Sequence, residues 1–148
     1  MSGYKDNTNW DVYWQGMIDT ESANKQFYLK NGFYRWKDRA TGENRSIPVR
    51  AGDPVVSHTG AVGIAQVQPE TESFIMRLYG RKSDPNRLKT DPQYNLSVGR
   101  LYFDYLINKF KDPRTGITDP TVAITAYIMG HNGMAKRIES DPINWYDN

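Results

Sequence analysis

Apolar residues near the start of the chain recur at helical spacing. They lie three or four residues apart, as on one face of an amphipathic helix, and they are Trp10, Trp14, Met17 and Ile18. The pattern predicts a helix over roughly 10–23. Glu21 lies four residues after Met17 and therefore extends the same stripe. Because burying a carboxylate costs free energy, Glu21 is the first residue that calls for a functional explanation.

Aromatic residues and turn signals follow this helix. Two short aromatic-rich runs flank Asn31–Gly32, a dipeptide that favours a tight β-hairpin. Thr41–Gly42 marks a second turn, and the segment 44–56 after it predicts a third strand. We therefore expect a small β lobe over 27–56, inserted after the first helix.

The rest of the chain has a mostly helical pattern. A helix is predicted over 69–79, followed by a charged loop over 81–90. Asp91–Pro92 and Asp119–Pro120 each open a further helix, because Asp at the N-cap followed by Pro is a typical helix start. The second of these helices is predicted to end near Gly130. The fold class predicted from these elements is α+β and mainly α.

The composition narrows the classes of protein that fit. The 148 residues are expected to form one domain over 1–148 with a substantial core. Nineteen basic and 17 acidic residues give a net charge of +2, which is too mild for a nucleic-acid-binding surface. The absence of cysteine excludes disulfides, and two histidines without ligand spacing predict no metal site.

Glu21 has two physical reasons for a raised pKa. Burial against the apolar stripe disfavours its anion, and the negative end of the helix dipole disfavours the anion further. A carboxylic acid that stays protonated near neutral pH is what a glycosidase needs to protonate a leaving oxygen. Position alone leaves a second interpretation open, in which Glu21 lies at the edge of the stripe, solvated or paired with an arginine.

Two later segments contain further candidate residues. Gly60 and Gly63 precede Gln66 in the sequence GAVGIAQVQPET, and glycines at this spacing let the backbone approach a ligand or another helix closely. Tyr127 precedes a glycine-rich turn in AITAYIMGHNG. Taken alone, the first segment also fits an ordinary loop before a helix, and Tyr127 also fits a core residue.

In this order, the segments resemble the lytic transglycosylases of the soluble, goose-type-lysozyme-like superfamily. Glu21–Ser22 matches the Glu-Ser pair that ends the first core helix of that family. The family's Gly-rich loop motif is matched by Ser57, Gly60, Ala61, Gly63, Gln66, Pro69 and Thr71. Its two later helix motifs are matched by Asp91, Pro92, Asn95, Gly99, Tyr102, Ala126, Tyr127 and Gly130.

The chain departs from the family pattern at several points. In the family the Glu stands shortly before the Gly-Ala motif, whereas Glu21 stands 39 residues before Gly60. The expected β lobe fills the difference. Gln68 replaces a Met, and Ile128 replaces the Asn that follows the Tyr. None of these departures affects the carboxylate of Glu21.

The resemblance implies a lysozyme-like helical domain that cleaves the MurNAc-β-1,4-GlcNAc bond of peptidoglycan glycan strands. Glu21 would be the single acid and base, and the MurNAc 6-hydroxyl would close a 1,6-anhydro ring without a second carboxylate. The resemblance also implies that Ser57 hydrogen-bonds Glu21. Gln66, Gln68 and Tyr127 would contact the substrate, and no cofactor is implied.

Two alternatives stay open for the function. The β lobe carries Asp38, Glu43 and Asp53, and one of these acids, if it faced Glu21, could position a water and make the protein a muramidase. The chain could also be a catalytically silent glycan-binding module of a virion. The aromatic residues of the lobe fit either sugar stacking or a small core of its own, and they are Tyr28, Tyr34 and Trp36.

The route to the cell wall is a further expectation. The N-terminal residues lack the apolar region of a signal peptide, and no run approaches the ~18 apolar residues of a transmembrane segment. A phage virion, release through a holin, or excision from a larger exported protein would each bring such a domain to the bacterial periplasm and wall. We expect a phage protein, because the domain is compact and begins at its own Met, with other virion proteins as partners.

Overall fold

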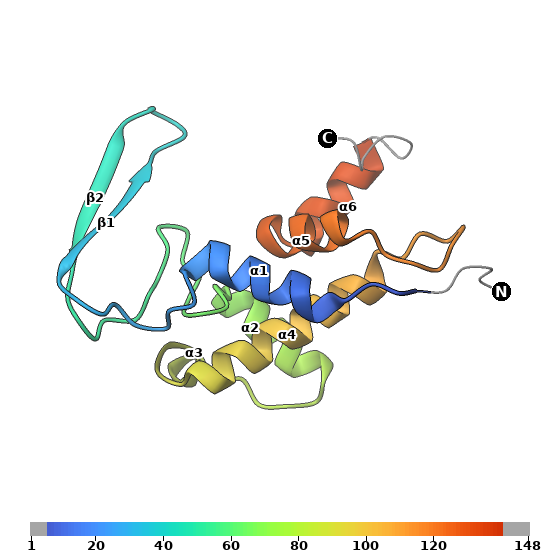
Figure 1. The fold of residues 1–148 in the computed structure, drawn as a ribbon, viewed down its shortest axis with the longest axis horizontal. Helices are drawn as coiled ribbons and strands as arrows, with labels where there is room; N and C mark the ends of the chain where they lie inside the picture. The colour runs from blue at the N-terminus through green and yellow to red at the C-terminus, as the bar shows by residue number, and fades with distance from the viewer. Residues whose placement is uncertain (1–5, 141–148) are drawn as a thin grey trace. The chain divides into compact units, whose positions relative to one another are not determined.

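The computed structural model describes residues 6–140, apart from the side chains of residues 131, 132 and 135. Within this range it contains the helices α1 to α6 and the strands β1 and β2 (Figure 1). The predicted fold class, mainly α with a small β lobe, is confirmed. In the described part of the chain, no helix combines the length and apolar character needed to cross a membrane.

The described residues group into two compact units. Unit 1 combines residues 6–17 with residues 100–140, and unit 2 is the continuous segment Ile18–Gly99. Two helices, α1 (Trp10–Ser22) and α4 (Pro92–Lys109), contribute residues to both units. The expectation of one domain for the whole chain stays a prediction.

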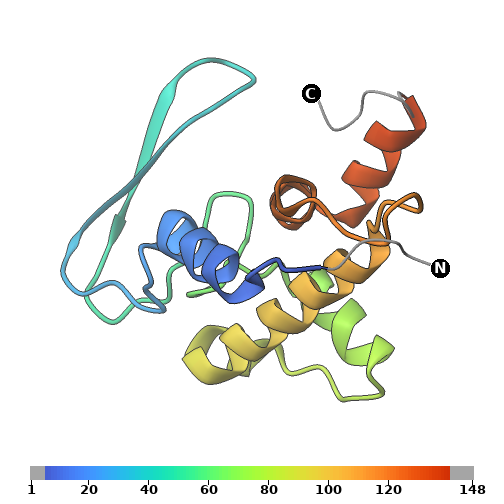
Figure 2. The ribbon, with the colours of Figure 1, turned by 45° about the vertical axis from the view of Figure 1, so that its right-hand side comes forward.

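Unit 1 contains the helices α5 (Pro120–Met129) and α6 (His131–Ser140), which follow each other directly (Figure 2). The start of α5 is as predicted, because the Asp119 carboxylate accepts a hydrogen bond from the backbone N–H of Thr121 at 2.8 Å. Gly130, with φ of +87°, ends α5 and redirects the chain. Helix α6 was not predicted, because its residues are mostly polar.

Aromatic side chains form much of the core of unit 1. The ring centroids of Trp10 and Trp14 lie 5.8 Å and 5.6 Å from that of Phe103 in α4. The ring of Trp14 also lies 5.8 Å from that of Tyr127 in α5. Such pairs stabilise a core beyond their buried area. The first two residues of the predicted apolar stripe therefore pack into this unit.

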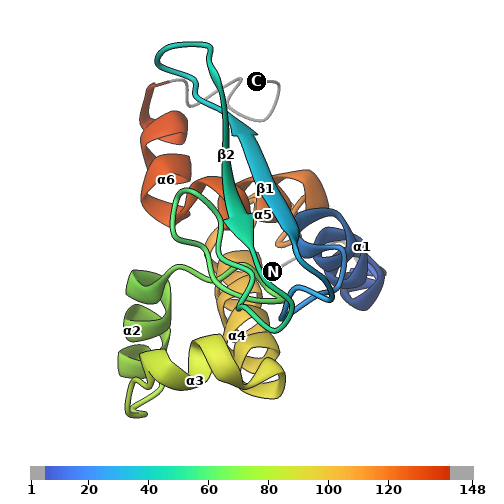
Figure 3. The ribbon, with the colours of Figure 1, turned by 90° about the vertical axis from the view of Figure 1, so that its left-hand side faces the viewer.

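A single antiparallel hairpin forms the β lobe of unit 2 (Figure 3). Its strands are β1 (Gly32–Lys37) and β2 (Asn44–Val49), with Gly32 opposite Val49 and Lys37 opposite Asn44. The strand predicted within 44–56 forms over residues 44–49, but it is the second strand of the hairpin and not a third strand. Beyond them, Phe27 and Pro54 pair as an isolated bridge at its base.

The hairpin turns at residues 38–43, and the tight turn predicted at Asn31–Gly32 was wrong. The Asp38 carboxylate accepts hydrogen bonds from two backbone N–H groups of the turn and pairs with the Arg45 guanidinium at 2.9 Å. Asn31 has a different role, because its side chain accepts a hydrogen bond from the N–H of Ala51 at 3.0 Å. This bond connects the two ends of the hairpin.

Two further helices lie in unit 2. The first, α2 (Pro69–Leu78), confirms the helix predicted over 69–79. The second, α3 (Pro85–Thr90), lies where the sequence predicted a charged loop, so that prediction was wrong. The Asp84 carboxylate caps α3 in an Asp-Pro start of the kind recognised elsewhere in the chain. Leu88 is the one buried side chain of α3, and a single apolar residue does not produce a periodic pattern in the sequence.

Candidate active site

Glu21 lies in the last turn of α1 and is exposed. The sequence predicted that Glu21 would be buried against the apolar stripe. The stripe instead ends at the buried residues Met17 and Ile18, and Glu21 lies beyond its buried part. Partial desolvation by the surrounding protein nevertheless raises the pKa of Glu21 above its ordinary value. Within residues 6–140, no hydrogen bond or ion pair involves its carboxylate. Such a group can give a proton and take one back.

Ser22 connects the end of α1 to the loop 57–68. Its Oγ atom lies 2.6 Å from the carbonyl oxygen of Ile64 and 3.1 Å from that of Ile18, within hydrogen-bond reach of both. Glu21 is therefore adjacent in sequence to a direct link between the helix and the loop. The two matched motifs of the sequence meet at this bond.

The loop folds back on itself through its backbone. Val62 pairs with Val56 and with Val67 as isolated bridges. Gly63 has φ of +76°, which favours glycine, and Gln66 has φ of +50°, which is uncommon for a residue with a side chain. The Gln66 amide donates a hydrogen bond to the carbonyl of Gly63 at 2.9 Å. This bond supports the turn that places Gln66.

Two buried amide side chains hold the backbone of the loop. Gln26, which is 5% exposed, accepts a hydrogen bond from the N–H of Ile64 at 2.8 Å and donates to the carbonyl of Leu88 at 3.0 Å. Asn95 accepts from the N–H of Ala65 at 2.7 Å and donates to the same Leu88 carbonyl at 2.9 Å. Sequence reasoning included Asn95 only as a motif match and missed Gln26.

The hydroxyl of Ser57 forms its hydrogen bonds within the loop. It accepts from the N–H of Ala61 at 3.0 Å and lies 2.9 Å from the hydroxyl of Thr59. The hydrogen bond to Glu21 that the resemblance implied is therefore not formed in this structure. Ser57 shapes the turn that begins the loop.

Gln68 occupies the N-cap position of α2, where its side chain makes no capping hydrogen bond. A Cβ atom built on Gly60, whose φ is +93°, would lie 3.4 Å from the Oε1 atom of Gln68. The amide of Gln68 therefore lies against the start of the loop. Gln66 and Gln68 belong to the same unit as Glu21, and their contact with a substrate stays a prediction.

Tyr127 belongs to unit 1, where it is 8% exposed. Its ring contacts Trp14, Tyr102 and Phe103, with centroid distances of 5.5–6.1 Å. These contacts make it part of the aromatic core of that unit. Its contact with a substrate also stays a prediction.

The three acids of the β lobe are bound to other groups of the lobe. Asp38 pairs with Arg45, whose guanidinium also lies 3.7 Å from Glu43. A backbone hydrogen bond in the turn, followed by the bond to Arg45, lowers the pKa of Asp38 below its ordinary value. Asp53 accepts a hydrogen bond from the N–H of Arg50 at 2.8 Å. In the described part of the chain, no three His, Asp or Glu side chains come together as a metal site.

Glu72 is a fully buried acid that sequence reasoning missed. Its carboxylate accepts hydrogen bonds from the hydroxyls of Ser83 and Tyr94 and from the N–H of Asp84. Burial, together with the hydrogen bond to Glu72, raises the pKa of Tyr94 to about 12. The carboxylate of Glu72 thus connects α2 to the starts of α3 and α4.

Comparison with known protein families shows to which family the loop 57–68 and the helices after it belong. Residues 51–145 match the family described as Transglycosylase SLT domain. The chain belongs to this family. The match includes the loop 57–68 and confirms the family that the sequence motifs indicated, whereas Glu21, Ser22 and the strands of the hairpin lie before residue 51.

Named relatives agree with this family. The chain is 35% identical over 98 residues to the endo-type membrane-bound lytic murein transglycosylase A of Klebsiella pneumoniae (strain 342), covering 61% of this chain and 46% of that protein. It is 28% identical over 89 residues to the membrane-bound lytic murein transglycosylase E of Buchnera aphidicola subsp. Acyrthosiphon pisum (strain APS), covering 58% and 40%. The chain thus spans less than half the length of these curated relatives. No solved structure gives a significant match.

Proposed function

We propose that the protein is a peptidoglycan lytic transglycosylase that cleaves the MurNAc-β-1,4-GlcNAc bond, with Glu21 as its single acid and base. The observation that carries the proposal is the raised pKa of Glu21 together with its surroundings. Its carboxyl group has a raised pKa and no fixed partner among the described residues. The hydroxyl of the next residue, Ser22, forms a hydrogen bond with the loop 57–68, and this loop lies within the residues that match the transglycosylase family.

The proposed reaction needs one carboxyl group and no water. Protonated Glu21 donates its proton to the glycosidic oxygen as the bond from that oxygen to C1 of MurNAc breaks, and GlcNAc leaves with a free 4-hydroxyl. The Glu21 carboxylate then takes the proton of the MurNAc 6-hydroxyl, whose oxygen bonds to C1. The product is a 1,6-anhydroMurNAc end, and Glu21 is protonated again.

The alternative, a hydrolytic muramidase, needs a second group that positions a water. The sequence offered Asp38, Glu43 and Asp53 for this role. All three contact other groups of the lobe, and two of them pair with Arg45. Their structural use favours the transglycosylase over the hydrolase.

The loop supplies the proposed contacts to the substrate. Gln66 is held in an uncommon backbone conformation, and Gln68 lies uncapped at the start of α2. We assign both amides to hydrogen bonds with the sugar on either side of the cleaved bond. In this proposal Ser57 maintains the loop, and Tyr127 contacts the substrate, as the family resemblance implies.

The test is mass spectrometry of purified peptidoglycan after digestion by the wild type and by Glu21→Gln. Muropeptides with 1,6-anhydroMurNAc ends, formed by the wild type and lost in the variant, are expected. Reducing MurNAc ends would replace the proposal with the muramidase, and Asp38→Asn and Asp53→Asn would then locate the second acid. Binding to peptidoglycan without either product would replace it with the silent glycan-binding module.

The proposed place of action is the bacterial cell wall, reached from the periplasm. The names of the relatives, which are murein transglycosylases, support this location. Delivery by a phage virion, with other virion proteins as partners, is a separate part of the proposal. Finding the chain by mass spectrometry in purified phage particles would support it, and finding it only in uninfected cells would contradict it.

A further inference from the structure

The hairpin carries an aromatic cluster that the proposed reaction does not use. Tyr34 and Trp36 lie in β1, two residues apart and so on the same face of the strand, and His58 comes from the loop 57–68. The ring centroids of Tyr34 and Trp36 are 5.3 Å apart, and those of Trp36 and His58 are 5.2 Å apart. We call these three side chains the aromatic platform.

The three rings are nearly parallel and lie against one another. Their planes differ by 6° to 29°, and the third pair, Tyr34 and His58, has a centroid distance of 6.2 Å. In a linear stack the two outer rings would be about twice as far apart as neighbours are. Because all three centroid distances lie between 5.2 and 6.2 Å, the rings form a triangle rather than a column.

The aromatic platform is not the interior of a core. Tyr34 and Trp36 are half-buried, His58 is exposed, and no residue of β1 or β2 is fully buried. Tyr28, the third aromatic residue noted in the sequence, lies at the base of the hairpin, where its backbone pairs with that of Asp53. A two-stranded ribbon without a covering layer leaves large apolar rings accessible.

Hydrogen bonds fix the platform to the candidate loop. The Tyr34 hydroxyl lies 2.9 Å from Nδ1 of His58, and the backbone N–H of His58 donates to the same hydroxyl at 3.2 Å. His58 directly follows Ser57, the first residue of the loop. The platform is thus built jointly by the hairpin and by the segment that presents Gln66 and Gln68.

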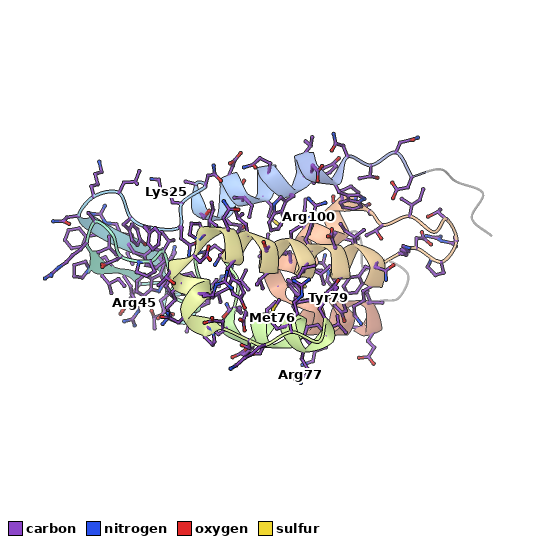
Figure 4. All side chains as sticks on the ribbon, turned by 90° about the horizontal axis from the view of Figure 1, so that it is seen from below. Lys25, Arg45, Met76, Arg77, Tyr79 and Arg100 are labelled. Carbon is purple, nitrogen blue, oxygen red and sulfur yellow. The ribbon has the colours of Figure 1, made fainter. Side chains whose placement is uncertain are left out.

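The charge around the platform favours an anionic partner. Residues 27–56 carry six basic and three acidic side chains, whereas the rest of the chain carries 13 and 14. Arg45 lies opposite Trp36 in the strand register and is labelled on the hairpin in Figure 4, but its guanidinium already pairs with Asp38 and Glu43. The surplus positive charge therefore comes from the other basic residues of the lobe. Aromatic rings on a lobe with surplus positive charge suit a glycan strand whose attached peptides bear carboxylates.

We propose that the aromatic platform of Tyr34, Trp36 and His58 is a binding subsite where a sugar ring of an anionic peptidoglycan strand stacks, away from the bond that is cleaved. This inference rests on the proposed function for its choice of glycan. Tyr34 and Trp36 of the subsite lie in the segment that the sequence inserts between Glu21 and the loop, and His58 belongs to the loop itself. Its role is to hold the strand, so it affects affinity more than the chemical step.

The test measures binding to purified peptidoglycan sacculi by co-sedimentation, in a Glu21→Gln background that prevents turnover. Trp36→Ala is expected to weaken binding about tenfold. Phe33→Ala is the matched control, because Phe33 lies in the same strand on the opposite face and is 60% exposed. Trp36→Phe keeps an aromatic face and should restore binding to within about threefold of the parent. Far-UV circular dichroism checks that each variant is folded.

The outcomes separate this inference from the proposed function. Equal binding of Trp36→Ala and Phe33→Ala, or no binding by the parent, overturns the subsite whatever products the wild type forms. A selective loss in Trp36→Ala supports the subsite even if the wild type forms no 1,6-anhydroMurNAc ends. In that case the proposed reaction fails while the binding site stands.

Discussion

Glu21 combines an exposed side chain with a pKa that partial desolvation raises above the ordinary carboxyl value. Protonation of such a group favours the folded state, so its contribution is fully present below the unfolded pKa of 4.5 and is lost as pH rises through the folded value. We predict that Glu21→Gln melts at the same temperature as the wild type or higher at pH 7. Below pH 4.5 the two melting curves should converge.

Thermal melts between about pH 4 and pH 8 measure this effect, with the range set by the ordinary carboxyl pKa. Glu70→Gln, at an exposed position in α2, controls for the general effect of removing a carboxylate. If Glu21→Gln were destabilised relative to the wild type at pH 7 but not at pH 4, the desolvation of the Glu21 carboxylate would be contradicted. It would mean that the ionised carboxylate has a stabilising partner.

Gly63 supports a second prediction at the scale of one residue. Its φ is +76°, and an added Cβ would collide with the side-chain amide of Asn95 and lie 2.5 Å from Oε1 of Gln26. Backbone strain and the clash together should make Gly63→Ala lower the free energy of unfolding by about 2–4 kcal/mol. Urea unfolding measures the loss.

The matched control is Gly16→Ala, in the interior of α1. A Cβ at Gly16 meets nothing within 4 Å, so alanine there should be neutral or stabilise by up to about 1 kcal/mol. Equal effects of the two substitutions would show that the amides of Gln26 and Asn95 move aside. The loop would then be less rigid than its hydrogen bonds indicate.

The residues that define the candidate site differ in how far the sequence reveals them. Glu21, Gly63 and Gln66 were found because a helical stripe and a glycine motif mark them locally. Gln26 and Glu72 were missed, because their partners become neighbours only on folding. The amide of Gln26, for example, contacts backbone groups 38 to 63 residues away. Polar pairs at such distances leave no periodic signal.

At the scale of elements, the buried Glu72 supports a prediction about the junction of α2, α3 and α4. Glu72→Ala would leave the hydroxyls of Ser83 and Tyr94 and the N–H of Asp84 without their acceptor. We expect a loss of about 3–5 kcal/mol in the free energy of unfolding, measured with urea. Glu70→Ala in the same turn of α2 is exposed and should cost less than about 1 kcal/mol.

Helix starts were predicted more reliably than the hairpin. The Asp-Pro pairs before α4 and α5 act through a cap within the same few residues, so the sequence contains the whole signal. The sequence contains two turn signals, Asn31–Gly32 and Thr41–Gly42, and the position of the hairpin depends on which of them forms the turn. Asp38 stabilises the turn at 38–43 with its own hydrogen bonds, while Asn31 bonds to Ala51 across the base of the hairpin. The local sequence at Asn31–Gly32 does not reveal which of the two signals forms the turn.

At the scale of the whole molecule, the sequence predicted a mainly helical fold because most of its helices have a strong pattern. It did not predict the grouping into two units, because unit 1 joins residues 6–17 to residues 100–140. The family match begins at residue 51. Glu21 and the hairpin therefore have to be judged from their contacts and their chemistry.

The uneven distribution of charge predicts how the whole molecule responds to salt. Residues 27–56 carry a net charge of +3, from six basic and three acidic residues, although the chain as a whole carries +2. If peptidoglycan binds at the lobe, Lys37→Gln should weaken co-sedimentation with sacculi about threefold at about 0.05 M salt, and the difference should vanish at about 0.5 M, where screening acts over a few ångströms. Lys136→Gln, at another exposed lysine, in α6, should change little at either salt concentration. Trp36→Ala should stay impaired at both, since ring stacking is not screened. Equal effects of the two lysine substitutions would instead attribute the attraction to net charge alone and would contradict a binding surface on the hairpin.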